Sequence, residues 1–272
     1  MRRFWLVAAM LGSVSAAQAA DMPVLRGGFA DDLPTTTNVN WQGFYVGGQG
    51  GYGSSDPKLG GANTGLITNL LDHNVIEQMQ VSTWQLPFGA VSTQSAAYGV
   101  FTGYNTQWDD VVLGLEASYV HGKFGGSASA FKRLVSGSAL TDNFFHDVGV
   151  SSSAGISISD MATFRGRAAY AWGCFLPYLF GGFALGNADI TRSVVITDAI
   201  SDTRAGPFSP LVPLSASEGL HNHLVYGYTL GLGVDVNLTG GLFMRAEWEY
   251  VRFTNQLDTA INTARLGLGY KF

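Results

Sequence analysis

The 272-residue chain is rich in glycine and aromatic residues and poor in charge, with 36 glycines, 12% aromatic residues and only 13% charged residues. After residue 20, no apolar run reaches the roughly 20 residues that a transmembrane helix needs, which excludes a helical membrane protein. The formal charge is −5, and without Arg2 and Arg3 it becomes −7, because 13 basic residues then face 20 acidic ones. Such an acidic chain has no electrostatic case for binding nucleic acid.

The N-terminus has the layout of a secretory signal peptide. Arg2 and Arg3 precede an apolar stretch at 4–11, and small residues follow it. This stretch is too short to anchor the chain in a membrane as a helix. We therefore predict a cleaved signal peptide at 1–20, followed by a flexible periplasmic lead at 21–40, which shows no hydrophobic periodicity.

Eight segments alternate apolar with polar or small side chains, the pattern of a strand with two different faces. The clearest, 224–238, far exceeds the 5 or 6 residues usual for a soluble strand and suits a tilted membrane strand of about 9 to 11 residues. Eight is the smallest common strand number of bacterial outer-membrane barrels. We predict an all-β fold, an eight-stranded antiparallel up-and-down transmembrane β-barrel. Its expected strands are 41–52, 96–108, 111–120, 164–172, 175–187, 224–238, 242–250 and 262–272.

The connections between these strands alternate in length. Tight ones fall at about 105–110, 173–175 and 238–241, whereas long ones fall at about 53–95, 121–162, 188–223 and 252–261. Outer-membrane barrels place short turns in the periplasm and long loops outside the cell. We therefore predict short periplasmic turns, long extracellular loops and both barrel ends in the periplasm.

Two apolar runs, at 81–91 and 196–212, are unusual for solvated loops. They could extend the barrel as hairpins above the membrane, bind a partner or rest on lipid headgroups. Extension as hairpins makes the fewest demands. Because connections of this length are commonly functional, an extracellular ligand is a further expectation, which the sequence does not identify.

Aromatic residues gather near both ends of the expected strands, as in the two interfacial belts of membrane proteins. The final segment ends in Tyr270 and Phe272, which we interpret as the signal for the barrel assembly machinery. Outer-membrane lipid and lipopolysaccharide are the other expected partners. The belt residues are Trp41, Tyr52, Tyr98, Trp108, Tyr119, Trp172, Trp248 and Tyr250.

Charged residues concentrate on the faces that the alternation turns inward. Eight strands leave a space that side chains fill, so a packed salt-bridge network is the favoured interpretation, and a narrow ion path is the alternative. The phases of 41–52, 96–108 and 175–187 stay undecided, since both faces carry glycine and aromatic residues. The expected network is Glu116, Arg165, Arg167, Asp235, Arg245, Glu247, Glu249, Arg265 and, near the periplasmic mouth, Lys271.

Several segments resemble the small porin-like outer-membrane proteins of alphaproteobacteria, the outer-membrane β-barrel domain family with opacity-type and rhizobial members. They are WQGFYVGGQGGYG (41–53), FRGRAAYAWGCFLPYLFGGFALG (164–186), LGLGVDVNLTGGLFMRAEWEYVRF (230–253) and ARLGLGYKF (264–272). The resemblance implies an eight-stranded barrel of the outer membrane with a structural or surface-interaction role. It fails in the long loops, so it implies no ligand.

Two other functions stay open as alternatives, a small-solute porin and a lipid-modifying outer-membrane enzyme. Neither GxSxG nor HExxH is present, and we predict no enzyme activity. Metal or haem binding has only a weak basis, because no cysteine or acidic residue stands at ligand spacing from a histidine. We expect no cofactor and no metal. The histidines considered are His73, His121, His146, His221 and His223.

Overall fold

The computed structural model describes residues 39–254 and 258–272, which belong to one compact unit, Thr37–Phe272. The predicted signal peptide and nearly all of the predicted lead lie outside the described residues. The described strands are β1 (Gly43–Pro57), β2 (Thr93–Trp108), β3 (Val111–Val135), β4 (Phe145–Tyr170), β5 (Phe175–Ser201), β6 (Ser209–Pro210), β7 (Leu214–Thr239), β8 (Leu242–Phe253) and β9 (Thr259–Lys271).

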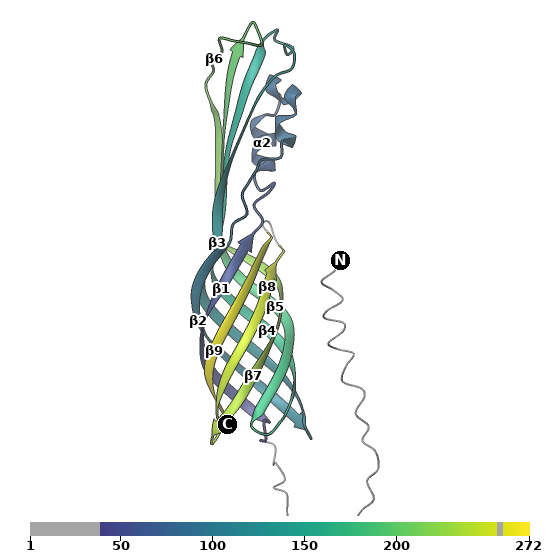
Figure 1. Cartoon of the computed structure of the whole chain (residues 1–272), viewed down its shortest axis with the longest axis vertical. Coiled ribbons are helices and arrows are strands. Elements are labelled where there is room, and N and C mark those ends of the chain that lie inside the picture. The colour runs from purple at the N-terminus through teal and green to yellow at the C-terminus, as the bar shows by residue number, and fades with distance from the viewer. Residues whose placement is uncertain (1–38, 255–257) are drawn as a thin grey trace, which may run out of the picture. The chain divides into compact units, whose positions relative to one another are not determined.

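Eight of these strands close into an antiparallel ring in the order β1, β2, β3, β4, β5, β7, β8, β9, with β9 pairing back onto β1 (Figure 1). The closing register runs from Tyr45 opposite Lys271 to Pro57 opposite Thr259. The predicted fold class is confirmed. The two-residue β6 pairs with β5 outside the ring. Tight turns join β2 to β3, β4 to β5 and β7 to β8 at one end of the ring, the tight-turn end; the opposite end is the loop end.

Four strands continue past the ring at the loop end, where β3 pairs with β4 as far as Val135, and β5 pairs with β7 as far as Leu214 (Figure 1). The prediction of loops at 121–162 and 188–223 is therefore wrong over most of their length. The real connections there are 136–144 and 202–213. We call the continued parts, 124–135, 145–158, 190–201 and 214–220, the stalk sheet.

A shift in the alternation explains why the sequence pattern stopped at the ring. The pairings of the four strands all slip at one level, between His121 and Phe124, Ile158 and Asp160, and Ala188 and Ile190. In β4, every even-numbered residue from His146 to Ile158 is buried, whereas from Met161 to Ala169 the buried residues are the odd-numbered ones. Bulges at the rim of a barrel bend strands in this way. Since the period-two phase changes there, each strand reads as two unrelated segments.

The connection between β1 and β2 forms a cap on the stalk sheet. This segment, 58–92, contains α2 (Thr64–Leu70) and two short 3-10 helices, η1 (Val75–Met79) and η2 (Val81–Thr83). Hairpin extension was therefore a wrong prediction for 81–91. No helix in the described ranges has the length and apolar content to cross a membrane. The cap buries Ile67, Leu71, Ile76 and Val81 against Val148, Val150, Val194 and Ile196 of the sheet.

Candidate functional site: the filled lumen of the ring

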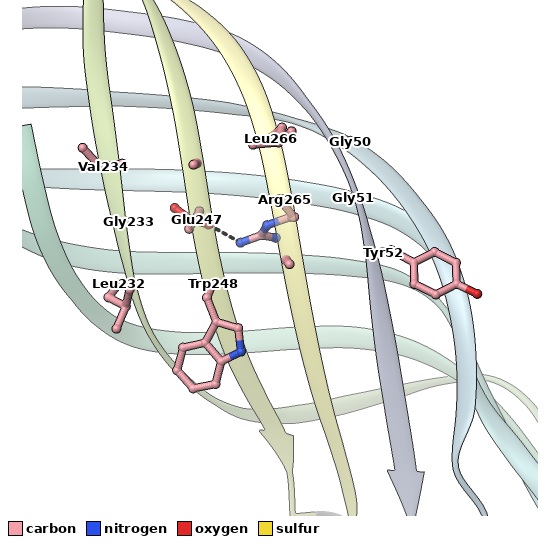
Figure 2. Close-up of a pocket in the computed structure, with 12 residues that line it drawn as sticks. Gly50, Gly51, Tyr52, Leu232, Gly233, Val234, Glu247, Trp248, Arg265 and Leu266 are labelled. Atoms are coloured by element: carbon pink, nitrogen blue, oxygen red, sulfur yellow. Dashed lines mark hydrogen bonds and ion pairs between the residues drawn. The ribbon is translucent and has the colours of Figure 1, made fainter. Parts of the chain in front are cut away.

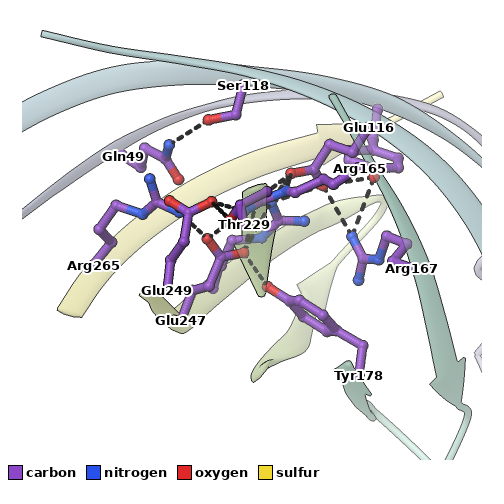
Figure 3. A network of polar contacts seen from close by, with 12 residues as sticks. Gln49, Glu116, Ser118, Arg165, Arg167, Tyr178, Thr229, Glu247, Glu249 and Arg265 are labelled. Carbon is purple, nitrogen blue, oxygen red and sulfur yellow. Dashed lines mark hydrogen bonds and ion pairs between the residues drawn. The ribbon is translucent and has the colours of Figure 1, made fainter. Parts of the chain in front are cut away.

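Eight charged side chains meet inside the ring and form what we call the charge cluster. Every member is buried and projects inward from its strand, as Figure 3 shows for the part it labels. Four arginines face four carboxylates, so the cluster is neutral overall. Its members are Glu116 of β3, Arg165 and Arg167 of β4, Asp235 of β7, Arg245, Glu247 and Glu249 of β8, and Arg265 of β9.

Glu116 is the centre of the cluster and receives hydrogen bonds from three arginines. Arg165 Nε donates to Glu116 Oε1 at 3.0 Å, and Arg167 Nη1 donates to Oε2 at 3.2 Å. Arg245 reaches across the lumen from β8, and its Nη1 lies 3.0 and 2.9 Å from the two oxygens. The Tyr45 hydroxyl adds a further donor at 2.7 Å. One carboxylate therefore joins strands from opposite sides of the ring.

The remaining carboxylates complete the cluster. Asp235 accepts from Arg245 Nε at 2.8 Å and from Arg167 Nη2 at 2.7 Å. Glu247 binds Arg165 and Arg265, and it also accepts from the Tyr178 hydroxyl at 2.9 Å. Breaking one buried pair leaves a charge without compensation, which is strongly destabilising. The cluster therefore ties five strands together from the inside.

An aromatic layer lies between the charge cluster and the tight-turn end. Its rings stack on the guanidinium groups: Arg245 Cζ lies 3.9 Å from the centre of Phe101, Arg167 Cζ 3.9 Å from that of Tyr178, and Arg165 Cζ 4.1 Å from that of Phe180. Desolvated contacts of this kind are favourable. We define the layer as Trp41, Tyr45, Phe101, Tyr178, Phe180 and Phe243.

Sequence reasoning missed most of this layer, because the phases of β1, β2 and β5 were undecided. The inner-face glycines carry the signal that could have found it. A Cβ added to Gly47 would lie 2.3 Å from Phe101 Cζ, and one added to Gly269 would lie 2.3 Å from Phe243 Cζ. Glycine is thus required opposite these two rings, and an aromatic residue that faces a glycine on a neighbouring strand is compatible with the inner face.

A third layer, mostly apolar, closes the lumen on the side of the loop end. Phe124, Ile158, Phe253 and Ile261 are its largest fully buried members, and Leu59 of the cap packs with them. Side chains thus fill the ring in three successive layers, aromatic, charged and apolar. This arrangement fits the expectation that eight strands enclose a packed core.

Two sequence-predicted residues lie elsewhere than expected. Lys271 stands apart from the charge cluster, and its Nζ donates to the Gln42 carbonyl at 3.3 Å, because it lies at the last paired position of β9. Trp41 was predicted to belong to the lipid-facing belt, but its ring is buried inside the aromatic layer, 6.1 Å from that of Phe243. It precedes β1, so the strand alternation does not govern its direction.

The other predicted belt residues turn outward. Tyr52, Tyr98, Trp108, Tyr119, Trp172 and Trp248 have exposed side chains, and Tyr250 is half-buried. Tyr270 and Phe272, the predicted assembly signal, are exposed and their rings meet edge to face at 5.2 Å. Anchoring in lipid and recognition by the assembly machinery stay predictions for these residues.

In the described chain, no group of three or more histidine, cysteine, aspartate or glutamate side chains could hold a metal ion. His121 Nδ1 lies 2.8 Å from Asp160 Oδ1 at the loop end of the ring. His146 is buried near the tip of the stalk sheet, with Nε2 2.9 Å from Asp142 and Nδ1 2.9 Å from Asp198. These contacts are structural ion pairs or hydrogen bonds.

The tip of the stalk sheet contains a second ionic contact, Arg133 with Asp147, which lies outside the ring. Arg133 Nε donates to Asp147 Oδ1 at 2.7 Å, and Nη2 donates to the other oxygen. The hydrogen bonds from Arg133 lower the pKa of the Asp147 carboxyl, although burial opposes the shift. The contact therefore favours the folded tip when Asp147 is ionised.

This lowered pKa predicts an acid-sensitive tip. The stabilisation is complete above the unfolded-state pKa of about 4 and is lost as the pH falls through the lower folded-state value. Amide hydrogen exchange in 133–147, corrected for intrinsic rates, should therefore accelerate below about pH 4. The acceleration should be smaller in Asp147→Asn, and equal protection of the native tip at pH 3 and pH 7 would contradict the assignment.

Comparison with known proteins gives the family of the chain. Residues 6–272 match the model of the outer membrane protein beta-barrel domain. The chain belongs to this family. Members sit in the outer membrane, so the tight-turn end of the ring faces the periplasm and the loop end, with the stalk sheet and cap, faces the exterior. The predicted family and location are confirmed.

Two individual relatives agree with the family assignment. The chain is 27% identical to the 22 kDa outer membrane protein of Rhizobium leguminosarum bv. viciae over 89% of this chain and 83% of that protein. It is 23% identical to the 25 kDa outer-membrane immunogenic protein of Brucella ovis over 68% and 67%. Among solved structures, the attachment invasion locus protein of Yersinia pestis is 13% identical with a TM-score of 0.34, covering 85% of this chain and 99% of that one.

Proposed function

We propose that the protein is a non-conducting outer-membrane barrel that holds a β-sheet stalk at the cell surface for structural or surface interaction. The observation that carries this proposal is the three-layer filling of the lumen. An ion crossing the ring would have to pass the aromatic layer, the charge cluster and the apolar layer in turn, and each consists of side chains that contact one another.

The charge cluster supports a sealed barrel more than an ion path. Its arginines and carboxylates are paired with each other at hydrogen-bond distance, so none of the four arginines lacks a carboxylate partner. A solute would have to separate these pairs in a setting of low dielectric constant, where separation is costly. The cluster therefore links opposite sides of the ring and blocks the lumen.

The stalk sheet and its cap have features that suit contact with other molecules at the cell surface. The strands that form the sheet are continuous with the ring, so the sheet is held above the membrane. Its inner face is covered by the cap. Its outer face carries small hydroxyl side chains, including Ser151, Ser153 and Ser193, and apolar side chains are exposed at 211–212 near the tip. A surface of this kind suits contact with other molecules outside the cell.

Conductance of the refolded barrel in a planar lipid bilayer tests this function. We expect no steady conductance steps from the full chain. The double variant Arg165→Ala with Arg167→Ala, which removes two arginines of the charge cluster, should conduct ions or fail to fold. Reproducible steps from the unaltered protein, lost or altered in charge selectivity when Arg165 and Arg167 are each replaced by lysine, would instead establish a small-solute porin.

A further inference from the structure

The cap contains a cavity of about 400 Å³, within the range of about 300–1,000 Å³ that small-molecule sites span. Its walls come from two segments, 60–67, which leads into α2 and begins it, and 82–88, which completes and follows η2 (Figure 1). Among the described residues that line the cavity, none is acidic or basic. It is separate from the apolar groove that Leu232, Trp248 and Leu266 line on the membrane-facing side of the ring (Figure 2). Because the cap lies on the exterior side, the cavity is available to molecules outside the membrane.

One buried polar group of the cavity wall has no hydrogen-bond partner within the described chain. Asn63 is 1% exposed, and its Nδ2 donates to the Ser153 and Ser193 carbonyls of the stalk sheet at 2.8 and 3.2 Å. Carbonyl oxygens only accept, so these contacts fix which end of the amide is the nitrogen. The other end, Oδ1, is buried and accepts no hydrogen bond from the described residues. Since a buried acceptor is costly without a donor, a ligand of this cavity should bring a hydroxyl or N–H group to Oδ1.

The rest of the lining combines apolar with hydrogen-bonding side chains. Trp84, Leu86 and Phe88 are half-buried and offer a large apolar area. Thr64 and Gln85 add a hydroxyl and an amide that no described group engages in a printed hydrogen bond with its side chain. A purely apolar ligand would bury these polar groups without hydrogen bonds, at a cost in free energy. A charged ligand would meet no opposite charge in the lining. The complementary ligand is therefore neutral, with an apolar face and several hydrogen-bonding groups.

We propose that this cavity binds one neutral sugar ring of a glycan at the cell surface. A pyranose ring has an apolar C–H face, which packs on aromatic and aliphatic side chains such as Trp84 and Leu86. Its rim carries hydroxyl groups, each of which both donates and accepts hydrogen bonds, so one of them can donate to Asn63 Oδ1. The uncharged lining selects neutral sugars over uronic acids and sugar phosphates. The proposal rests on the surface role proposed above and names a partner for it, but it does not depend on a sealed lumen.

Saturation-transfer NMR of the full chain in sugar-free detergent micelles tests the cavity, with the methyl glycosides of glucose, galactose, mannose and N-acetylglucosamine as probes. At least one probe should receive saturation from the protein. Gly60→Phe should reduce this transfer at least fivefold, because a Cβ at Gly60 meets no atom within 4 Å and the ring can fill the cavity. Gln85→Leu, which removes an amide but keeps the size, should also reduce it. Gly137→Phe, in the connection at the tip, is the matched control, since a Cβ there also meets nothing within 4 Å.

Slow hydrogen exchange of the Ile67 and Leu71 amides, which bond within α2, reports that the cap stays folded in each variant. The absence of transfer to all four glycosides would overturn the proposal. Equal transfer in the unaltered protein and in folded Gly60→Phe would overturn it too, as would equal transfer to glucuronate. Glycoside binding by a barrel that conducts ions would defeat the sealed lumen and leave this site intact.

The source of the sugar is decided by competition. Polysaccharide released from the lipopolysaccharide of the producing cells is added to the bound glycoside. Loss of the saturation signal would support the site with a glycan of the same envelope as its ligand. An unchanged signal would support it with a glycan from outside the cell.

Discussion

Replacement of Glu116 by glutamine should destabilise the barrel by roughly 3–5 kcal/mol, the range found when one partner of a buried ionic network is removed. Glutamine keeps the size of the side chain but leaves Arg165, Arg167 and Arg245 with one negative charge too few. Its amide nitrogen also places donors where the three guanidinium groups already donate. Urea unfolding of the barrel in lipid vesicles, followed by tryptophan fluorescence, measures the change.

The matched control is Glu218→Gln in the stalk sheet. Glu218 pairs with Arg192 at 2.7 Å, but both side chains are partly exposed, so solvent screens the pair. Its loss should cost about 1 kcal/mol or less. If the two variants unfolded at the same urea concentration, the charge cluster would contribute no more to the stability of the barrel than a surface ion pair does. The proposal that the cluster links opposite sides of the ring would then be wrong.

The second large effect is expected from Phe101→Ala in the aromatic layer. Phe101 is almost fully buried, contacts Tyr45 and Phe243, and stacks on the Arg245 guanidinium. Truncation of a buried phenylalanine leaves a cavity and costs roughly 3–5 kcal/mol. Gly47 faces the ring closely, so the backbone cannot move far enough to fill the space. The same urea titration gives the value.

Phe183→Ala on the outward face of β5 provides the comparison. This phenylalanine is 75% exposed to the membrane side, where lipid chains can occupy the space that its ring leaves. Its removal should therefore cost much less than that of Phe101. A double variant of Phe101→Ala with Glu116→Gln should lose less than the two single changes together, because both act through Arg245. Strict additivity would count against a single coupled lumen.

Much of the ring could be predicted because the membrane imposes one rule on every strand inside it. In β7, Leu230 and Leu232 face lipid while Asp235 and Thr229 face the lumen, and this alternation can be read directly from the sequence. The same rule identified eight members of the charge cluster. It gave no answer in β1, β2 and β5, where glycine and aromatic residues occupy both faces and the hydrophobic contrast is lost.

The residues that sequence reasoning misplaced all lie where this rule ends. Trp41 precedes the first strand and turns into the lumen, where its backbone N–H donates to Gln107 at 2.6 Å. Lys271 is the last residue of β9 and reaches the rim rather than the cluster. Above the membrane, the buried face of the stalk sheet is the apolar one, since water replaces lipid on the outside. The apolar side of the alternation therefore faces outward in the ring but inward in the stalk sheet. The bulges also shift the phase of the alternation.

The sequence by itself determined the fold class, the outer-membrane location and the identity of the inward charges, because lipid on one side and a packed lumen on the other leave an alternation of period two. Only the tertiary structure decided which charges pair, since Glu116 and Arg245 are 129 residues apart and meet across a closed ring. It also decided that most of two predicted loops forms a stalk sheet. These features depend on register between strands, which no single segment of the chain encodes.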